Sequence, residues 1–490
     1  MKDTTYYRST KSPDQAGRDT YRLIIAKRNG SEILLSSSGP GWTLPRLEIL
    51  PTDRVAEQLT AKVHTEIGVR AYCHCVLDTP ARNCSSGPAL RAIMEAVEQD
   101  PQAPAGTCWF PINGELQNFS DVCDEGVGLT EVLQDANDGL SRQHAGPFST
   151  PGWLAQLFEW VQTQLDPQGF QITGVIRQLN ASSTFSLIRL ETDGPAVWFK
   201  ATGQPNLDER PISLSLARLF PEYVPAIVGV HPTWNGWLCE EASGTTLDGL
   251  AESSVWERVA AELATLQIAS VGKYEELLAS GCKDRRLSKL IEYVNPFLAR
   301  MTDLMAAQER ISPEPLTRSQ LSLLGDRLKE ACARLEEIGL PATLGHTDFN
   351  PGNILVSSTA CCFLDWAEGC VAHPFVTFEY LREHAQRALR QDAARGERLA
   401  GAYLRPWQSF FSLDVLAHAM AFSPLIAVFV SAIASETWRS LDPVRDLNFA
   451  AYFRSLTRRM YREATARVQE TSDFSIADMT LKTERARCGF

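Results

Sequence analysis

Three polar side chains between residues 344 and 366 have the types and the spacing that phosphoryl transfer requires. Asp348 and Asn353 lie five positions apart, and Asp365 follows Asn353 twelve positions later. Phosphoryl transfer uses one carboxylate beside the acceptor hydroxyl, together with an amide and a second carboxylate that bind Mg²⁺ on the nucleotide phosphates. Asp348 fits the first of these roles, and Asn353 and Asp365 fit the second.

Two short apolar segments connect these residues. Residues 354–356 (Ile-Leu-Val) and 361–364 (Cys-Cys-Phe-Leu) have the composition of β-strands. We expect them to form a hairpin, because a hairpin would bring Asn353 and Asp365 to the same end.

The motif resembles the signature of the aminoglycoside phosphotransferase family, the small-molecule relatives of the protein kinases. It reads His346-Thr347-Asp348 with Asn353, followed by an apolar strand that ends in Asp365-Trp366, and its Asp-to-Asn spacing matches the protein-kinase catalytic loop. The resemblance implies a bilobal, protein-kinase-like fold that uses ATP or GTP with Mg²⁺. It also implies that Asp348 is the catalytic base or orients the acceptor hydroxyl, that Asn353 and Asp365 bind the metal, and that His346 supports the loop.

The resemblance places a phosphate-binding lysine upstream of this loop. Lys200 ends the apolar strand 197–201, where the lysine of the family lies. Its partner glutamate should lie near the start of the next helix, which favours Glu209, with Glu222 as the alternative.

Two further nucleotide contacts follow from the resemblance. Ser183 lies in the polar loop 180–184, which contains no glycine, so hydroxyls and backbone amides would contact the phosphates. Glu241 lies in segment 240–244, which resembles the hinge whose backbone groups meet the base.

The chain departs from the family pattern at two places. The helix before the catalytic loop often carries Leu-His in this family, and here the pair is Leu266-Gln267. The Gly-Asp-Pro that often follows the metal aspartate is replaced by Ala372-His373-Pro374.

The first part of the chain has the pattern of a mixed α/β domain. Residues 21–37 read as a hairpin through Asn29-Gly30, and residues 54–67 read as a helix that Gly68 ends. Strand-like segments follow at residues 71–77, 92–98 and 108–110, before a polar, Pro- and Gly-containing linker at residues 137–151.

This front domain resembles the Nudix hydrolase fold, but its catalytic box is degenerate. Clustered glutamates on one helix normally bind the Mg²⁺ that activates water. Here Ala61, Lys62 and Thr65 stand where the box has Arg, Glu and Glu, and Glu66 remains without the others. We expect the Nudix fold to be kept and the hydrolase to be absent, which leaves substrate capture, dimerisation or scaffolding as roles.

The predicted organisation is therefore α/β (α+β), with a Nudix-like domain at residues 1–145 and a phosphotransferase-like domain at 150–490. The second domain divides into a β-rich lobe at about 150–245, a helical lobe at about 246–470 and a tail at 471–490. Apolar residues at helical spacing support the helical lobe; they are Trp256, Val259, Leu263 and Leu266 in one helix, and Leu321, Leu324, Leu328, Cys332 and Leu335 in another.

The composition of the chain limits the classes of binding partner that we expect. The chain has 490 residues and a net charge of −12, which argues against a non-specific nucleic-acid partner. The N-terminal residues lack the apolar core of a signal peptide, so a cytoplasmic location with reduced cysteines is expected. The apolar stretch 415–434 contains Pro424, and we expect two buried core helices broken there rather than a membrane span.

These observations predict a small-molecule kinase that transfers the γ-phosphoryl group of ATP or GTP to a hydroxyl. The sequence does not identify the acceptor molecule. Glu368 and Glu379 could bind a cationic acceptor, but they are equally explained as solvated surface residues. A nucleotide-binding pseudokinase and a Nudix hydrolase with a kinase-like appendage are the alternatives. No membrane partner is expected, and a homodimer stays open.

Overall fold

The computed structural model describes residues 18–38, 41–50, 54–77, 90–111, 146–389, 393–442 and 446–466. The described residues combine helices and strands, as the predicted α+β class requires. They belong to two compact units, which are described separately. The first unit comprises the described parts of Met1–Arg210 with Ala226–Glu241, and the second comprises Pro211–Pro225 with the described parts of Ala242–Phe490.

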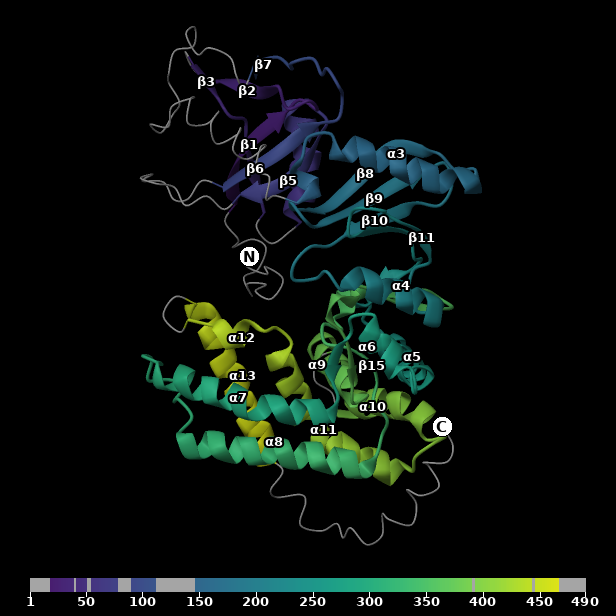
Figure 1. Ribbon diagram of the computed structural model, residues 1–490, viewed down its shortest axis with the longest axis vertical. Helices are drawn as coiled ribbons and strands as arrows, with labels where there is room; N and C mark the ends of the chain where they lie inside the picture. The colour runs from purple at the N-terminus through teal and green to yellow at the C-terminus, as the bar shows by residue number, and fades with distance from the viewer. Residues whose placement is uncertain are drawn as a thin grey trace. The chain divides into compact units, whose positions relative to one another are not determined.

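The first unit begins with a mixed sheet whose strands are ordered β3-β2-β1-β6-β5, with β4 paired to β1 and β7 paired to β2 (Figure 1). The β1–β6 pair is parallel and the other pairs are antiparallel. The predicted hairpin is confirmed, since β1 pairs with β2 and Gly30 adopts a φ of 67° in the turn. The strands are β1 Asp19–Ala26, β2 Glu32–Ser38, β3 Gly41–Thr43, β4 Arg46–Ile49, β5 Ala71–Leu77, β6 Leu90–Ala96 and β7 Thr107–Pro111.

One helix packs against this sheet. Helix α1 (Val55–Lys62) continues as one wider turn, Val63–Ile67, and ends at Gly68, whose φ of 89° is left-handed. Leu59 and Val63 are fully buried in the same cluster as Leu23 of β1 and Met94 of β6. The predicted helix and its glycine stop are therefore confirmed, whereas the predicted linker lies mostly outside the described residues.

A second sheet in the first unit has the strand order β11-β12-β10-β9-β8. Its strands are β8 Ile172–Ala181, β9 Ser186–Thr192, β10 Val197–Ala201, β11 Ile227–Val230 and β12 Gly236–Glu240. Helix α3 (Trp153–Leu165) lies along this sheet (Figure 1). Leu157 and Val161 of α3 are fully buried in one cluster with Ile188 and Phe199.

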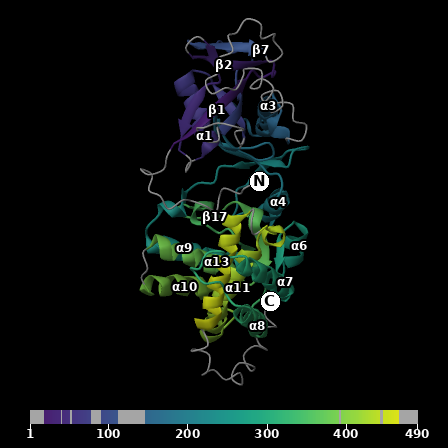
Figure 2. The ribbon, with the colours of Figure 1, turned by 90° about the vertical axis from the view of Figure 1, so that its left-hand side faces the viewer.

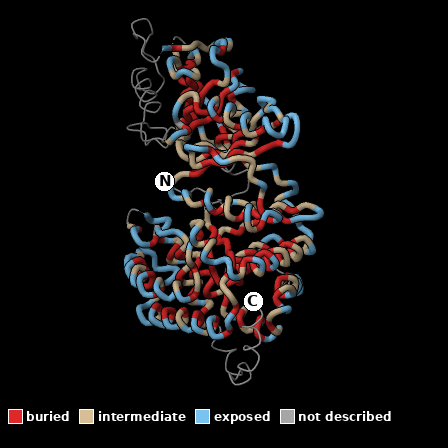
Figure 3. Tube along the Cα trace, turned by 45° about the vertical axis from the view of Figure 1, so that its right-hand side comes forward, coloured by how far each residue is buried: buried red, intermediate tan, exposed pale blue. Residues whose placement is uncertain are grey.

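The second unit consists mainly of helices. The chain passes from the first unit to the second within α4 (Glu209–Leu219). Figure 2 shows α9, α10, α11 and α13 within it, and Figure 3 shows its buried interior in red. The apolar faces predicted around Trp256 and Leu328 are buried in α5 and α8, and Gly339 ends α8 with a φ of 77°. The helices are α5 Ser253–Ala269, α6 Tyr274–Ala279, α7 Leu287–Ala306, α8 Arg318–Ile338, α9 Phe375–Ala388, α10 Ala393–Trp407, α11 Leu413–Ile433, α12 Thr437–Ser440 and α13 Leu447–Ala466.

Two small sheets among these helices carry the predicted chemistry. One has the order β13-β16-β17 and the other β14-β18-β15. The hairpin expected after Asn353 is confirmed, because Ile354 of β16 pairs with Phe363 of β17. The strands are β13 Thr245–Thr246, β14 Lys283–Arg285, β15 Thr343–His346, β16 Ile354–Val356, β17 Cys361–Phe363 and β18 Gly369–Ala372.

The expectation that Pro424 breaks the chain into two helices is wrong. Helix α11 runs unbroken from Leu413 to Ile433 with Pro424 inside it. A proline inside a helix removes one backbone hydrogen bond, and here the surrounding turns are packed, since Leu425, Ile426 and Phe429 are almost fully buried. Among the described helices, α11 alone has the length and apolar composition of a membrane span, and most of it is buried inside the unit.

The described cysteines agree with the expectation of reduced thiols. All nine carry free thiols, and five of them are buried. No group of three or more His, Cys, Asp or Glu side chains suited to a metal occurs in the described part of the chain.

The two departures from the family pattern are both structural contacts around α9. The Gln267 amide donates to the carbonyl of Pro374 at 2.8 Å and accepts from the Tyr403 hydroxyl at 2.6 Å. The Nδ1 atom of His373 accepts a hydrogen bond from the Phe375 N–H at 3.3 Å, in the first turn of α9. Gln267 and His373 therefore join α5, α10 and the start of α9.

We predict that burial of neutral histidines makes the second unit sensitive to acid. Burial lowers the pKa of His373 to about 3 and that of His384 to about 4. Between these values and the ordinary value near 6.5, the unfolded chain binds more protons than the folded one. Stability is therefore complete above about pH 6.5 and falls as the pH drops, by about 1.4 kcal/mol per pH unit for each histidine.

The variant His373→Asn keeps an acceptor for the Phe375 N–H and removes one of these titrations. Urea unfolding followed by helical circular dichroism between pH 4 and pH 7 should give a shallower pH dependence for this variant than for the wild type. The exposed His64→Asn in the first unit is the matched control. Equal slopes for His373→Asn and the wild type would contradict the argument from burial.

Candidate functional site

The catalytic loop predicted from the sequence is a tight turn between β15 and β16. The Asn350 side chain accepts a hydrogen bond from the Gly352 N–H at 3.0 Å and so begins a short 3₁₀ helix, Pro351–Asn353. Pro351 occupies the first helical position, where the missing N–H costs nothing and the fixed φ suits the helix. The sequence Asn-Pro-Gly thus places Asn353 five residues after Asp348 on a short, fixed path.

Asp348 is half-buried at the start of this loop. Its Oδ1 accepts hydrogen bonds from the Asn350 amide at 3.2 Å and from the Tyr380 hydroxyl of α9 at 3.2 Å. Burial raises the pKa of Asp348, and the charge of Asp365 acts in the same direction, while the donors Asn350 and Tyr380 oppose both effects. The carboxylate is therefore shielded from water but retains specific donors, as a group that orients or receives a proton should.

His346 contacts the loop and the hairpin through both of its ring nitrogens. Its Nδ1 accepts the backbone N–H of Asp348 at 3.1 Å, so Nε2 carries the proton and donates to the carbonyl of Leu364 at 3.1 Å. Burial lowers the pKa of His346, which favours this neutral imidazole. The ring therefore connects the residue that precedes Asp365 to the backbone of Asp348.

Asn353 and Asp365 lie at the same end of the β16–β17 hairpin. The backbone N–H of Leu364 donates to the carbonyl of Asn353 at 2.8 Å, and the Asn353 amide donates to the carbonyl of Asp348 at 3.2 Å. Asp365 is exposed and has a φ of 63°, the one positive value among the described non-glycine residues. Such a backbone costs energy and is typical of functional positions.

The residues at this end of the hairpin fit Mg²⁺. An amide oxygen and a carboxylate are hard oxygen ligands, and Mg²⁺ is commonly held by one or two such protein groups while phosphates and water supply the rest. The amide nitrogen of Asn353 donates to the carbonyl of Asp348, so the amide oxygen points away from this contact.

Lys200 and Glu209 form an ion pair in the first unit. Lys200 lies in the central strand β10, opposite Leu187 of β9 and Trp237 of β12, and Glu209 is the first residue of α4. Glu209 is almost fully buried, and both side chains are held in place by the pair. The structure therefore pairs Lys200 with Glu209, whereas the alternative, Glu222, lies in the second unit.

The other two predicted nucleotide contacts also lie in the first unit. Ser183 is in the loop between β8 and β9, and its carbonyl accepts the Phe148 N–H at 3.1 Å. The carboxylate of Glu241 binds Arg189 and the Trp198 indole N–H, and its own N–H donates to the carbonyl of Ala196. A base at this position would therefore meet the carbonyl of Glu241 rather than its N–H.

Sequence reasoning missed the residues of α9 that contact the catalytic loop. Tyr380 is 32 residues from Asp348, and the hydroxyl of Thr377 accepts the His346 N–H at 2.9 Å. Gly345 makes this approach possible, because a Cβ there would lie 3.0 Å from the sulfur of Cys370 and 3.2 Å from the hydroxyl of Thr377. The glycine before His346 was the one signal of close packing in the sequence.

The one carboxylate that remains in the degenerate box is already paired with a lysine. Glu66, the one glutamate left in the degenerate box, is half-exposed and pairs with Lys62 at 3.0 Å. Lys62 also donates to the carbonyl of Glu48 at 2.8 Å. A single carboxylate already paired with a lysine cannot replace the glutamate cluster that activates water in a Nudix site.

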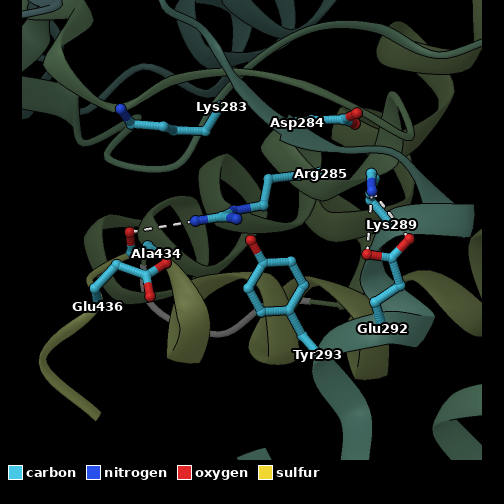
Figure 4. Close-up of a pocket in the computed structure, with 8 residues that line it drawn as sticks. All are labelled: Lys283, Asp284, Arg285, Lys289, Glu292, Tyr293, Ala434 and Glu436. Atoms are coloured by element: carbon cyan, nitrogen blue, oxygen red, sulfur yellow. Dashed lines mark hydrogen bonds and ion pairs between the residues drawn. The ribbon is translucent and has the colours of Figure 1, made fainter. Parts of the chain in front are cut away.

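A pocket of about 300 Å³ in the second unit contains none of the predicted site residues. Arg285 crosses it toward the end of α11 and donates to the carbonyls of Ile433 and Ala434, while Lys289 pairs with Glu292 (Figure 4). These cations already have protein partners, and acidic side chains balance them on the lining. The pocket is lined by Lys283, Asp284, Arg285, Lys289, Glu292, Tyr293, Ala434 and Glu436.

Comparisons with known proteins agree with this geometry. Residues 238–409 match the model of the phosphotransferase enzyme family. No curated protein matches the chain. The matched segment contains the catalytic loop and the β16–β17 hairpin.

Solved structures of small-molecule kinases resemble the chain at low identity. Macrolide 2'-phosphotransferase MphH from Brachybacterium faecium is 17% identical with a TM-score of 0.40, covering 65% of this chain and 100% of its own. Ethanolamine kinase from Plasmodium vivax is 15% identical with a TM-score of 0.44, covering 70% and 98%. Choline kinase from Cryptosporidium parvum is 10% identical with a TM-score of 0.46, covering 65% and 97%.

The family match and the loop geometry rest on the same residues, since Asp348, Asn353 and Asp365 all lie within the matched segment. The match to the phosphotransferase enzyme family therefore covers residues 238–409, from β12 to just past the end of α10.

Proposed function

We propose that the protein is a small-molecule kinase that transfers the γ-phosphoryl group of ATP or GTP to a hydroxyl group. The observation that carries this proposal is the arrangement of the catalytic loop. Asp348 is held on one oxygen by Asn350 and Tyr380, and the adjoining hairpin presents Asn353 and Asp365 at one end.

In the proposed reaction, Asp348 accepts a hydrogen bond from the acceptor hydroxyl and orients its oxygen toward the γ-phosphorus. Transfer of a phosphoryl group depends mainly on positioning and on neutralising charge, so a fixed carboxylate is sufficient for this task. Asn353 and Asp365 would hold Mg²⁺, which neutralises charge on the phosphates when it is bound.

Lys200 would contribute a fixed positive charge toward the nucleotide phosphates. Its ion pair with Glu209 restrains a side chain that would otherwise sample many rotamers. The phosphate-facing loop with Ser183 and the carbonyl of Glu241 would complete the nucleotide contacts. The cytoplasmic location, the homodimer and the absence of nucleic-acid or membrane partners stay predictions from the sequence.

A pseudokinase that binds nucleotide without transferring phosphate is the alternative. It needs no oriented carboxylate, whereas here two donors and a neutral histidine fix Asp348. The retained acidic and amide residues therefore favour turnover.

We predict that Asp348→Ala reduces phosphoryl transfer by roughly 10²–10⁴-fold while Mg-nucleotide binding is retained, because the carboxylate acts on the acceptor rather than on the metal. Asp365→Ala should weaken Mg-nucleotide binding itself. A panel of hydroxyl-containing metabolites and antibiotics with radiolabelled ATP and GTP measures transfer, and calorimetry measures binding.

The exposed Asp326→Ala on α8 is the matched control and should behave as the wild type. The kinase proposal is wrong if the wild-type chain binds Mg-nucleotide but phosphorylates no member of the panel, and if both variants bind Mg-nucleotide as tightly as the wild type does. Diphosphate cleavage that survives Asp348→Ala would instead favour a hydrolase in the front domain.

A further inference from the structure

Both side-chain donors that reach the carboxylate of Asp348 contact the same oxygen. The Asn350 amide and the Tyr380 hydroxyl each lie 3.2 Å from Oδ1. In the described part of the chain, neither of these donors reaches Oδ2. The two contacts therefore distinguish the oxygens of one carboxylate, and they leave Oδ2 to meet an acceptor hydroxyl.

Tyr380 differs from Asn350 because it comes from outside the loop. It lies on α9, whose Phe378 stacks on Tyr403 with ring centroids 4.0 Å apart and whose buried Glu379 accepts from the Ser423 hydroxyl at 2.8 Å. One turn earlier on the same helix, Thr377 binds the backbone of His346. Helix α9 therefore contacts the loop through Thr377 and Tyr380, and it is itself packed into the core.

We propose that Tyr380 is a positioning residue that fixes the rotamer of Asp348, so that Oδ1 is occupied and Oδ2 faces the acceptor hydroxyl. This inference rests on the proposed kinase function. Without the Tyr380 hydroxyl, Asp348 keeps one donor from its own loop, and rotation about its side-chain bonds becomes easier.

Loss of this hydrogen bond should act on the acceptor side of the reaction. Tyr380 binds the carboxylate that would orient the acceptor hydroxyl, so removal of its hydroxyl should lower kcat while the KM for the nucleotide stays unchanged.

The test is Tyr380→Phe, which removes one hydroxyl and keeps the ring. We expect kcat to fall about tenfold, as for the loss of one hydrogen bond to a charged group, with KM for the nucleotide unchanged. The exposed Tyr274→Phe on α6 is the matched control. An unchanged kcat, or a lower kcat together with lower stability or a raised nucleotide KM, would overturn the proposal.

A measurement without turnover separates this inference from the proposed function. At one fixed pH, the carbon-13 NMR signal of the Asp348 carboxyl should broaden or shift in Tyr380→Phe relative to the wild type, because the side chain samples more rotamers. A wild-type chain that phosphorylates no acceptor would overturn the kinase function. An unchanged Asp348 signal would overturn the role of Tyr380, whatever the activity.

A second, independent observation concerns the front domain, which is bound to the strand that leads into the phosphate-facing loop. The buried Gln178 of β8 accepts the Cys73 N–H at 2.8 Å and donates to the Cys73 carbonyl at 2.6 Å. Thr60 of α1 lies 3.3 Å from the same amide. One glutamine side chain thus acts as a backbone partner for β5 of the front domain.

The segment that enters α3 contacts the tip of the loop itself. Phe148 donates its N–H to the carbonyl of Ser183, and a Cβ on Gly146 would lie 2.7 Å from that carbonyl oxygen and 2.5 Å from Thr184. Inside the loop, the Ser182 hydroxyl accepts the Phe185 N–H at 2.9 Å. The glycine-free loop is therefore held by contacts with the segment that precedes α3 and by a hydrogen bond within the loop itself.

We infer that the front domain is a brace for the phosphate-facing loop, and that Gln178 transmits this support through β8. The brace acts on a loop in the same compact unit and needs no catalytic residue of its own. It gives a degenerate Nudix-like domain a structural task in nucleotide binding.

In the full chain, Gln178→Ala should increase amide hydrogen exchange in residues 180–185 and raise the dissociation constant of Mg-nucleotide several-fold, with the acceptor KM unchanged. The exposed Gln408→Ala on the C-terminal side of α10 is the matched control. Faster exchange with unchanged nucleotide affinity would overturn the brace, and so would unchanged exchange. A wild-type chain that phosphorylates no acceptor would overturn the kinase function, and the brace would still be supported if Gln178→Ala speeds exchange and weakens Mg-nucleotide binding.

Discussion

The candidate site depends on one buried imidazole. His346 accepts the backbone N–H of Asp348 on one nitrogen and donates to the carbonyl of Leu364 on the other. A protonated ring could not accept, and a ring in the other tautomer could make neither bond. Burial selects the neutral form, because it disfavours charge at this position. A single proton on Nε2 therefore keeps the backbone of Asp348 and the end of the β16–β17 hairpin in register.

The strained backbone of Asp365 follows from this constraint. Leu364 is held by His346 and by the carbonyl of Asn353, and Trp366 is buried with its indole N–H on the carbonyl of Phe363. Asp365 lies between two fixed residues and adopts a left-handed φ of 63° that leaves its carboxylate exposed. The cost of this conformation is borne by the packing on both sides, as is usual where strain presents a functional group.

The sequence predicted the parts of the fold and site that depend on local order. The spacing of Asp348, Asn353 and Asp365, the hairpin between them and the glycine that ends α1 are all encoded within a few residues. The pairing of Lys200 with Glu209 also depended on a short separation. The contacts of Tyr380 and Gln178 could not be predicted, because they join residues 32 and 105 positions apart and no pattern marks a single tyrosine or glutamine.

The error at Pro424 has the same origin. A proline read locally ends a helix, since it removes a backbone hydrogen bond. Helix α11 lies among α7, α8, α9 and α13, and this packing holds its axis through the proline. Tertiary burial outweighed a local preference that costs about 3 kcal/mol. At the start of α9, Gln267 donates to the carbonyl of Pro374 and His373 accepts the Phe375 N–H, so both residues have structural contacts there.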